Sequence, residues 1–352
     1  MKKTLVIAAA AAGILSVALL AMSCGSGKGS GNSQTARGAS DSAEWKWTRK
    51  LTLVCPWGVG GGADGTLRPL QPLLQDILGV PVEIVNVEGA GGANGVNFAQ
   101  KQPADGYTYV LTTQSIILLD LQKILPFDYQ KELQPVAKLV HSTNLLISSK
   151  KAMQGKYNNF EEFIAYAKAH PQELSCAMLT ATGQDSVSMK QTLAEALGVT
   201  ISEVDKYVKS VSYGGGAEMS SALVGGHISL GVAGGEEIQG LVASGDIVPL
   251  IAMSENRVSS VPDVPCTKEL GLNSYIGSWR AIYARTGTPQ AAVDSLAAAL
   301  KKAWDMPAYQ EFLKNSGYLD RPGYAGREET QALAQSEYAI FTAYLKDIGI
   351  LR

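Results

Sequence analysis

Histidine and cysteine are scarce in this chain, which holds only three histidines and four cysteines among 352 residues. So few of these side chains leave little material for a metal site or for a nucleophile and its base. Charged residues make up 18% of the chain, below the usual share of about a quarter, and the formal net charge is −2. Because no basic block occurs either, the sequence predicts no binding to nucleic acid.

The sequence also lacks the short motifs that mark common enzyme classes. His141, His170 and His227 are not spaced as metal ligands, and no C-x-x-C, H-E-x-x-H or G-x-S-x-G motif occurs. The adjacent acids Glu161–Glu162 and Glu236–Glu237 would point in different directions on a helix, so we interpret them as solvated helix faces. We therefore expect that the chain is not an enzyme and uses no cofactor or metal.

Apolar residues and glycine are plentiful instead. Hydrophobic residues make up 46% of the chain, which argues against a disordered protein, and the length predicts about two domains. There are 37 glycines without a G-X-Y period, so we expect them in turns and loops rather than in a collagen-like repeat.

The first residues have the pattern of an export signal. Lys2 and Lys3 precede an apolar run over 5–20, and the next residues, Leu20-Ala21-Met22-Ser23-Cys24, resemble the lipobox at which bacterial lipoproteins are cleaved and acylated. The alternative is an uncleaved membrane anchor, because the run approaches the roughly 18 residues that a membrane span needs.

The lipobox resemblance implies a signal peptide over 1–23, lipid on Cys24 and a lipidated, flexible Gly/Ser-rich tether over 24–47. The mature protein is then expected outside the cytoplasm, in the periplasm or on the outer face of the cell membrane, where the lipid anchors it.

Three cysteines remain for the folded body, and an odd number gives no disulfide framework. Cys55 and Cys176 lie in apolar, strand-like surroundings, which favours buried core positions. Cys266 follows Pro265 in an expected loop. One disulfide is possible among the three, and the sequence does not select the pair.

Strand-like and helix-like segments alternate along the body. Strands are predicted over 51–56, 82–87, 107–113, 145–148, 228–232 and 248–253, and helices over 64–78, 93–100, 159–170, from Thr288-Pro289 onward and around an apolar face of Phe341, Tyr344, Leu345 and Ile348. This alternation predicts an α/β fold with mainly parallel sheets.

Two glycine-rich turns each follow a predicted strand and precede a predicted helix. They span 56–64 and 88–94. Adjacent parallel strands would bring both turns to the same carboxyl edge of a sheet, where α/β proteins bind ligands. Bare backbone amides at such turns can hold a carboxylate without a lysine or arginine. The alternative is that the glycines only permit tight turns.

A dinucleotide site is a weaker interpretation of the first turn. The run from Gly58 to Ala63 formally fits G-x-G-x-x-G/A, and Glu83 follows 25 residues after Gly58. The match carries little weight in so glycine-rich a segment, and export would remove the protein from the cytoplasmic nicotinamide pool.

An ordered set of motifs resembles the substrate-binding proteins of tripartite tricarboxylate transporters, the Bug family. The set covers about residues 48–350 and consists of Pro56-Trp57 through Asp64, Gly89-Ala90-Gly91-Gly92, Pro103-Ala104-Asp105-Gly106-Tyr107-Thr108, Gly214-Gly215-Gly216-Ala217-Glu218, Leu223-Val224-Gly225-Gly226-His227, Ser244-Gly245-Asp246, Val261-Pro262-Asp263-Val264-Pro265 and Gly287-Thr288-Pro289.

The resemblance implies a two-lobed periplasmic-binding-protein fold, type II-like, with mainly parallel central sheets and a hinge. Lobe 1 would comprise 48–140 plus 283–352, and lobe 2 would comprise 141–282, with segments crossing near 140 and 280. Such proteins close on a small carboxylate and deliver it to a membrane permease.

The resemblance also implies which positions contact the ligand. The first-lobe set is Trp57, Gly60, Gly61, Gly62, Ala63, Asp64, Ala90, Gly91, Gly92, Asn94, Thr112, Thr113, Gln114 and Ser115, and the second-lobe set is Thr182, Gly183, Gln184, Asp185, Tyr213, Gly214, Gly215 and Gly216. Asp64 is also expected to cap the helix that follows it.

Two departures from the family pattern fall in the second lobe. Ser188 stands where the family often has histidine, and Ala233 lies near a position where the family often has aspartate. We hypothesise that Asp185 and Glu236 accept hydrogen bonds from an amino group if the ligand is a zwitterion. Arg280 could hold a second carboxylate through two hydrogen bonds, or it could form a surface ion pair beside a core Trp279.

The function expected from these features is capture of a small carboxylate, either a di- or tricarboxylate or a related organic or amino acid. The expected partners are the permease subunits of a tripartite transporter and, through the N-terminal lipid, a membrane. The chain is expected to be a monomer. The alternative is an exported hydrolase that acts on a small carboxylate ester.

Overall fold

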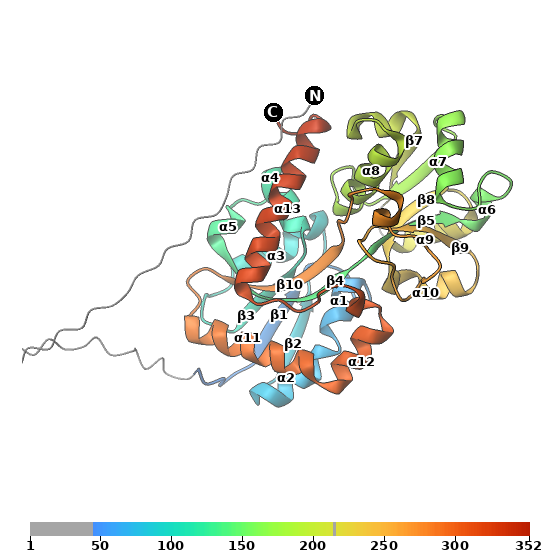
Figure 1. Ribbon diagram of the computed structural model, residues 1–352. Helices are drawn as coiled ribbons and strands as arrows, with labels where there is room; N and C mark the ends of the chain where they lie inside the picture. The colour runs from blue at the N-terminus through green and yellow to red at the C-terminus, as the bar shows by residue number, and fades with distance from the viewer. Residues whose placement is uncertain (1–44, 214–215) are drawn as a thin grey trace, which may run out of the picture. The chain divides into compact units, whose positions relative to one another are not determined.

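Two mixed β-sheets organise the part of the chain that the computed structural model describes, residues 45–213 and 216–352 (Figure 1). Sheet A has the strand order β2-β1-β3-β10-β4 and is built from β1 (Leu51–Cys55), β2 (Val82–Asn86), β3 (Thr108–Thr112), β4 (Leu133–Ser142) and β10 (Ser278–Arg285). Strand β1 pairs in parallel with β2 and β3, whereas β10 runs antiparallel to β3 and β4.

Sheet B has the same kind of order, β7-β6-β8-β5-β9. Its strands are β5 (Asn144–Ser149), β6 (Leu174–Met178), β7 (Val208–Ser212), β8 (Leu230–Gly234) and β9 (Ile247–Ala252). Strand β6 pairs in parallel with β7 and β8, and β5 runs antiparallel to β8 and β9. The predicted α/β fold is therefore confirmed, with one reversed strand in each mainly parallel sheet.

Helices cover both faces of sheet A. One face packs against α1 (Gly62–Leu67), α2 (Leu70–Leu78), α11 (Gln290–Asp305), α12 (Pro307–Asn315) and η4 (Tyr318–Asp320). The other packs against α3 (Ala93–Gln100), α4 (Ser115–Leu121), α5 (Tyr129–Glu132) and α13 (Arg327–Asp347), the long red helix of Figure 1. The short η1 (Ala90–Gly92) precedes α3.

Sheet B is covered in the same way. One apolar cluster includes residues of α6 (Lys150–Met153), α7 (Phe160–Ala169), α8 (Gln184–Leu197) and η2 (Ile201–Lys206). A separate cluster includes residues of α9 (Gly216–Gly225) and α10 (Gly235–Ala243). The short η3 (Thr267–Leu270) follows β9. Because both faces of the inner strands are buried, β1, β3, β5 and β8 are mostly buried runs rich in apolar residues, whereas the edge strand β7 is largely exposed.

The chain passes from sheet A to sheet B between β4 and β5 and returns before β10. The outward passage is the single residue Thr143, and the return covers 253–277. Both passages lie close to the positions at which crossing segments are expected. Pairing of Ser278 with Ser142 holds the two passages side by side.

The predicted helix over 64–78 is interrupted, and this is a correction to the sequence analysis. It consists of α1 and α2, separated at Arg68 and Pro69. Arg68 and Pro69 keep right-handed helical dihedrals, but proline has no backbone N–H, so the helical hydrogen bonding is interrupted between α1 and α2. In contrast, the predicted cap of α7 is confirmed, because the Asn159 side chain accepts a hydrogen bond from the Glu162 amide.

Cys55, Cys176 and Cys266 are all buried free thiols, so no pair of them forms a disulfide. The predicted core positions of Cys55 and Cys176 are thereby confirmed. Within residues 45–213 and 216–352, no helix has the length and apolar character that a membrane span requires. Residues 1–44, which include the predicted signal peptide, Cys24 and most of the tether, lie outside the described residues.

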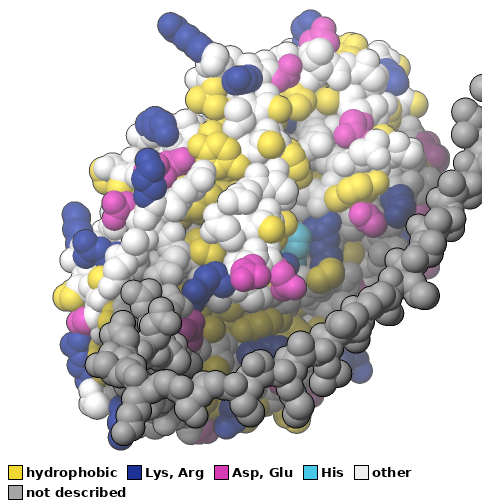
Figure 2. Space-filling model, turned by 60° about the vertical axis from the view of Figure 1, so that its left-hand side comes forward, with side chains coloured by type: hydrophobic (Ala, Val, Ile, Leu, Met, Phe, Trp, Pro, Cys, Tyr) yellow, Lys and Arg dark blue, Asp and Glu magenta, His cyan; other side chains and the backbone are white. Residues whose placement is uncertain are grey.

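Acidic and basic side chains are interspersed on the face of the molecule drawn in Figure 2. This distribution agrees with a sequence that has no block of one charge.

Candidate functional site

Three predicted turns meet at one edge of sheet A. Because β1 pairs in parallel with both β2 and β3, the residues that follow these strands emerge at the same carboxyl edge. The Val87 amide donates to the Cys55 carbonyl at 2.9 Å, so the second turn begins directly beside the end of β1. The sequence-based expectation that both glycine turns share one edge is thus confirmed.

The Asp64 side chain fixes the backbone of the first turn through hydrogen bonds. Its carboxylate accepts hydrogen bonds from the Gly60 amide, from Arg68 Nε and from Asn86 Nδ2, each at 3.0 Å. The side-chain amide of Asn86 also donates to the Trp57 carbonyl at 2.8 Å. Burial alone would raise the pKa of Asp64, but the hydrogen bonds from Arg68, Gly60 and Asn86 outweigh it and lower that pKa.

The prediction that Asp64 is the N-cap of the first helix is wrong. Helix α1 begins at Gly62 with Gly61 as its N-cap, and Asp64 is the third helical residue. The glycine run imposes no steric limit on the backbone, so the helix starts two residues earlier than expected. From its position inside the helix the carboxylate reaches back to the Gly60 amide and fixes the turn.

Glycines 92 and 95 allow the second turn to pack against the first. A Cβ at Gly92, whose φ is +100°, would lie 3.2 Å from the Trp57 ring, and a Cβ at Gly95 would lie 2.6 Å from Pro56 Cα. Only glycine fits this close approach. Val59, Gly60 and Gly61 of the first turn are exposed, and so are Gly89, Ala90, Gly91 and Asn94 of the second.

The third turn of sheet A is more enclosed. Thr112, Thr113 and Gln114 are buried, and the Thr113 hydroxyl accepts a hydrogen bond from the Ser115 amide at 3.1 Å. The Gln114 side chain donates to the Gly277 carbonyl and accepts from the Trp279 amide at 3.2 Å. Its amide group is therefore used to hold the returning strand β10.

The second-lobe candidates lie where β6 ends and α8 begins. Thr182 and Gly183 precede that helix, and the Gln184 side chain donates to Ser188 Oγ at 3.0 Å and to the Gly277 carbonyl at 3.3 Å. The Gly277 carbonyl thus accepts hydrogen bonds from both predicted glutamines, Gln114, which follows β3 of sheet A, and Gln184, which begins α8 beside sheet B. The structure brings these two residues, one from each predicted set, together at this point.

Asp185 of α8 and Tyr213, which follows β7, are also held by contacts within the half of the fold built on sheet B. Asp185 Oδ2 accepts a hydrogen bond from the Leu179 amide at 2.8 Å, and burial raises the pKa of this carboxyl. Tyr213 is half-buried against the apolar cluster of α9 and α10. Gly214 and Gly215 lie outside the described residues, and Gly216 is the first residue of α9.

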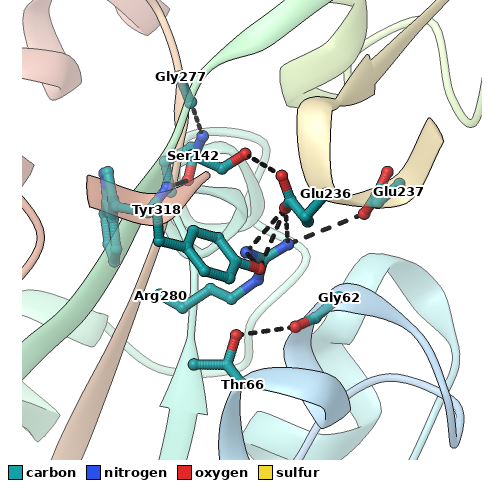
Figure 3. Close-up of polar contacts among 10 residues, drawn as sticks. Gly62, Thr66, Ser142, Glu236, Glu237, Gly277, Arg280 and Tyr318 are labelled. Atoms are coloured by element: carbon teal, nitrogen blue, oxygen red, sulfur yellow. Dashed lines mark hydrogen bonds and ion pairs between the residues drawn. The ribbon is translucent and has the colours of Figure 1, made fainter. Parts of the chain in front are cut away.

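Arg280 lies between the two sheets and contacts a carboxylate of the chain itself (Figure 3). Its guanidinium donates to Glu236 Oε1 from both Nη atoms at 3.2 Å and to the Tyr318 hydroxyl at 2.7 Å. The second oxygen of Glu236 accepts a hydrogen bond from Ser142 Oγ at 2.7 Å. Burial would lower the pKa of Arg280, but Tyr318, Glu236 and Glu237 together hold it above its usual range.

The sequence analysis needs two corrections here. Arg280 forms a buried ion pair rather than a surface one, with side chains of Arg280 and Glu236 only 5% and 10% exposed. The interpretation of Glu236–Glu237 as a solvated face is consequently wrong for Glu236, although the Glu237 side chain is 46% exposed. Trp279 is fully buried, as predicted, and its Nε1 donates to Glu337.

Several contributing residues were not singled out in the sequence. Arg68 stands four residues after Asp64, a helical spacing at which an ion pair could have been anticipated. Ser142, Tyr318 and Asn86 had no such signal, because their partners are distant in the chain. Within residues 45–213 and 216–352, no group of three or more His, Cys, Asp or Glu side chains could hold a metal ion.

A surface groove of about 600 Å³ lies away from these turns. Leu133, Pro135, Arg327 and Gln331 are among its lining residues, and none of the predicted site residues lines it.

Comparison with known proteins identifies the family. A family model described as "Tripartite tricarboxylate transporter family receptor" matches residues 66–350. The chain is 31% identical over 305 residues to the "UPF0065 protein in gbd 5'region" of Cupriavidus necator, an alignment that covers 86% of this chain and 89% of that protein.

Two solved structures show the same fold. The structure "R. palustris Rpa4515 with adipate" is 25% identical, with a TM-score of 0.74 and coverage of 86% of this chain and 98% of that one. The periplasmic binding protein BugD is 23% identical, with a TM-score of 0.71 and the same coverage. The family consists of transporter receptors, so the prediction that the chain is not an enzyme is confirmed and the hydrolase alternative is dropped.

Proposed function

The chain belongs to the family of tripartite tricarboxylate transporter receptors, and from that premise we propose that it is an extracytoplasmic solute-binding lipoprotein. It captures a small carboxylate between two lobes and delivers it to the membrane permease of a tripartite transporter. Lipid on Cys24 anchors it to the membrane, and the tether lets the folded body move above the surface. It acts as a monomer without a cofactor.

The observation that carries this proposal is the pair of glycine turns at one edge of sheet A. Both turns expose backbone at Gly60, Gly61, Ala90 and Gly91, and neither exposed run contains a basic side chain. Backbone amides that converge on one place provide a local positive potential for an anion. A protein with a net charge of −2 needs such a local attraction, because its overall charge repels a carboxylate.

The ligand named for Rpa4515, adipate, is a linear dicarboxylate. A ligand of this kind suits a site with anion-binding turns on one lobe and polar groups on the other. In this chain the turns at 62–63 and 90–94 supply the direct contacts to one carboxylate, because the amides of Gly60 and Gly61 already donate to Asp64 and to the Gly58 carbonyl. Gln114 and Gln184 act indirectly, since they bind the Gly277 carbonyl and fix the segment between the lobes.

The lobes of the proposal follow the two sheets. Because the expected bounds at 140 and 282 fall inside β4 and β10 of sheet A, we draw lobe 1 as 48–142 plus 278–352 and lobe 2 as 143–277. The two passages between the sheets then serve as the hinge. Closure about this hinge would bury the carboxylate and present a closed surface to the permease.

Native mass spectrometry of the full-length chain, purified gently from membranes and then denatured, tests the proposal. We expect one mono-, di- or tricarboxylate per chain, and we expect intact mass to show acylation at Cys24. An empty protein that also shows no thermal shift with a panel of such acids would contradict carboxylate capture.

The lipid and the ligand are tested separately. Growth with a labelled fatty acid should mark the parent chain but not Cys24→Ala, and carboxylate binding should be the same in both. Membrane retention of a parent chain that carries no label would instead support the uncleaved anchor.

A further inference from the structure

The ion pair between Arg280 and Glu236 joins the two halves of the fold. Arg280 belongs to β10 of sheet A, whereas Glu236 is the second residue of α10, which packs on sheet B. The two residues are separated by 44 positions in the sequence. Figure 3 shows the start of α10 and the first helical turn of α1 on opposite sides of the Arg280 guanidinium.

Glu236 has no polar atom left without a partner in the chain. Oε1 accepts hydrogen bonds from Arg280 and from the Tyr318 hydroxyl at 3.1 Å, and Oε2 accepts one from Ser142. Arg280 in turn donates to Tyr318, so a relay runs from Arg280 through Tyr318 to Glu236. All three partners of Glu236 belong to the half of the fold built on sheet A, because Arg280 lies in β10, Ser142 ends β4 and Tyr318 begins η4.

Burial makes this contact behave as a two-state element. With 5% and 10% of their side chains exposed, the two charges are stable only while paired, and separating them needs hydration of both. Small displacements between the sheets would therefore leave the pair intact, whereas a larger opening would break it as a unit.

The ion pair also touches the first glycine turn. A Cβ at Gly62, the first residue of α1, would collide with the Arg280 guanidinium and would lie 2.9 Å from Glu237 Oε1. The backbone proposed to contact the carboxylate thus rests directly on the side chain that binds α10. Any movement of α10 relative to β10 changes the support of that turn.

We propose that Glu236 is a positioning residue, which through Arg280 and Tyr318 latches sheet B to sheet A and fixes the first glycine turn for ligand binding. In this role Glu236 does not touch the ligand. The part of the inference that concerns affinity rests on the proposed function, but the latch between the sheets does not.

Glu237 provides a matched control one residue away. Its Oε1 lies 3.8 Å from Arg280 Nη2 without a hydrogen bond between them, and its side chain is 46% exposed. Glu237→Gln removes the longer ion pair to Arg280 from the same helical turn, yet keeps the hydrogen bonds of Glu236 to Arg280, Tyr318 and Ser142. A general electrostatic effect would act on both substitutions, whereas the latch is lost only in Glu236→Gln.

Closure of the ligand-free, full-length protein is the first measurement. Dyes on cysteines introduced at Asp76 of α2 and Glu161 of α7, both exposed, report the distance between the two sheets by single-molecule energy transfer. We expect Glu236→Gln to lengthen and broaden the distance distribution and Glu237→Gln to match the parent. An unchanged distribution in Glu236→Gln would overturn the proposal.

Affinity for adipate is the second measurement. We expect Glu236→Gln to weaken adipate binding about tenfold, mainly through faster dissociation, with little change in Glu237→Gln. Tighter adipate binding by Glu236→Gln would also overturn the proposal, because it would mean that Glu236 occupies the ligand's place on Arg280. If the parent protein binds no carboxylate, the proposed function fails and the distance measurement alone decides the latch.

Milder variants guard against loss of the fold. Tyr318→Phe removes the relay but keeps the ion pair, and Arg280→Lys keeps the charge but loses the planar fork that serves two partners. Both should shift the distance distribution in the same direction as Glu236→Gln, by a smaller amount. Circular dichroism of each variant checks that it is folded, and wild-type distributions in both folded variants would contradict the latch.

Discussion

Single buried polar side chains hold the segments on which the proposed site is built. Asp64 joins the Gly60 amide, Arg68 and Asn86, and Gln114 joins the Gly277 carbonyl to the Trp279 amide. A buried hydrogen bond contributes little net stability, but an unpaired buried group costs about 1–3 kcal/mol. Substitution of such a residue should therefore destabilise the fold by more than the loss of one hydrogen bond would.

Asp64→Asn should lower the free energy of unfolding at pH 7 by about 1–3 kcal/mol, because Asp64 is 2% exposed and loses charge-assisted hydrogen bonds. The substitution should also weaken carboxylate binding, since the first turn loses its support. Urea unfolding monitored by circular dichroism measures the first effect. The exposed Asp76 of α2 serves as control, and Asp76→Asn as damaging as Asp64→Asn would argue against this role.

Glu337 should make stability depend on pH. Burial raises the pKa of Glu337 from 4.5 to about 7, while Trp279, Arg321 and Lys138 act in the opposite direction. Between these two values the folded protein holds a proton that the unfolded chain has lost, so stability falls as pH rises from 4.5 to 7 and then levels off. We expect a loss on the order of 3 kcal/mol.

Glu337→Gln should remove this part of the pH dependence, because the amide is neutral throughout and its oxygen still accepts the Trp279 hydrogen bond. Urea midpoints at pH 5 and pH 8 compare the variants. The exposed Glu328, on the same helix, is the control, and Glu328→Gln should retain the parent's slope. A slope that survives in Glu337→Gln would assign it to another group.

At the scale of elements, the close packing of α3 against the first turn places the two glycine turns side by side. Pro56 lies in the first turn at this contact. On the other side, Gly92 and Gly95 have no side chain that would keep α3 and its preceding turn away from it. The turns are therefore not independent loops, since a change in the packing of α3 moves both. This is the physical reason for glycine within a helix, where it is otherwise unfavourable.

Gly95→Ala should lower the free energy of unfolding by about 1–3 kcal/mol, because the new methyl group would overlap Pro56 and the Val87 carbonyl, which are backbone groups that cannot rotate away. Carboxylate affinity should fall with it. Thermal unfolding and calorimetric titration measure the two effects. Gly65→Ala in α1, where nothing lies within 4 Å, should be neutral or stabilising, and equal damage there would contradict the packing argument.

At the scale of the whole molecule, Arg321 ties the end of β4 to the return passage between the sheets. Its guanidinium contacts His141 Nε2 at 2.9 Å and the Tyr275 carbonyl at 2.6 Å. Burial and the positive charges of Arg321 and Lys138 lower the pKa of His141 well below its usual value, so this imidazole stays neutral and can accept the hydrogen bond. The two sheets should therefore unfold together.

Arg321→Gln should separate the unfolding of the two sheets, because a shorter side chain cannot contact both the end of β4 and the return passage. Scanning calorimetry should show a broadened or split transition in place of a single one. Arg257→Gln, which removes an exposed ion pair with Glu269, should leave the transition unchanged. A single, unshifted transition in Arg321→Gln would show that the passages need no such tie.

The sequence by itself determined the features that depend on near neighbours. Alternating apolar runs and glycine turns predicted six of the ten described strands, the shared edge of the two turns and the family, and Asn159 predicted the start of α7, whereas β4, β6, β7 and β10 were not predicted. Tertiary structure decided the rest. The partner of Arg280 is 44 residues away and that of Gln114 is 163 residues away, so no local pattern could indicate them. Likewise, the reversed strands β5 and β10, each the first strand after a passage between the sheets, were not distinguished from the parallel strands by any local pattern. Local propensities fix turns and helix ends, whereas the choice among distant polar partners is made only when the fold brings them into the same dry space.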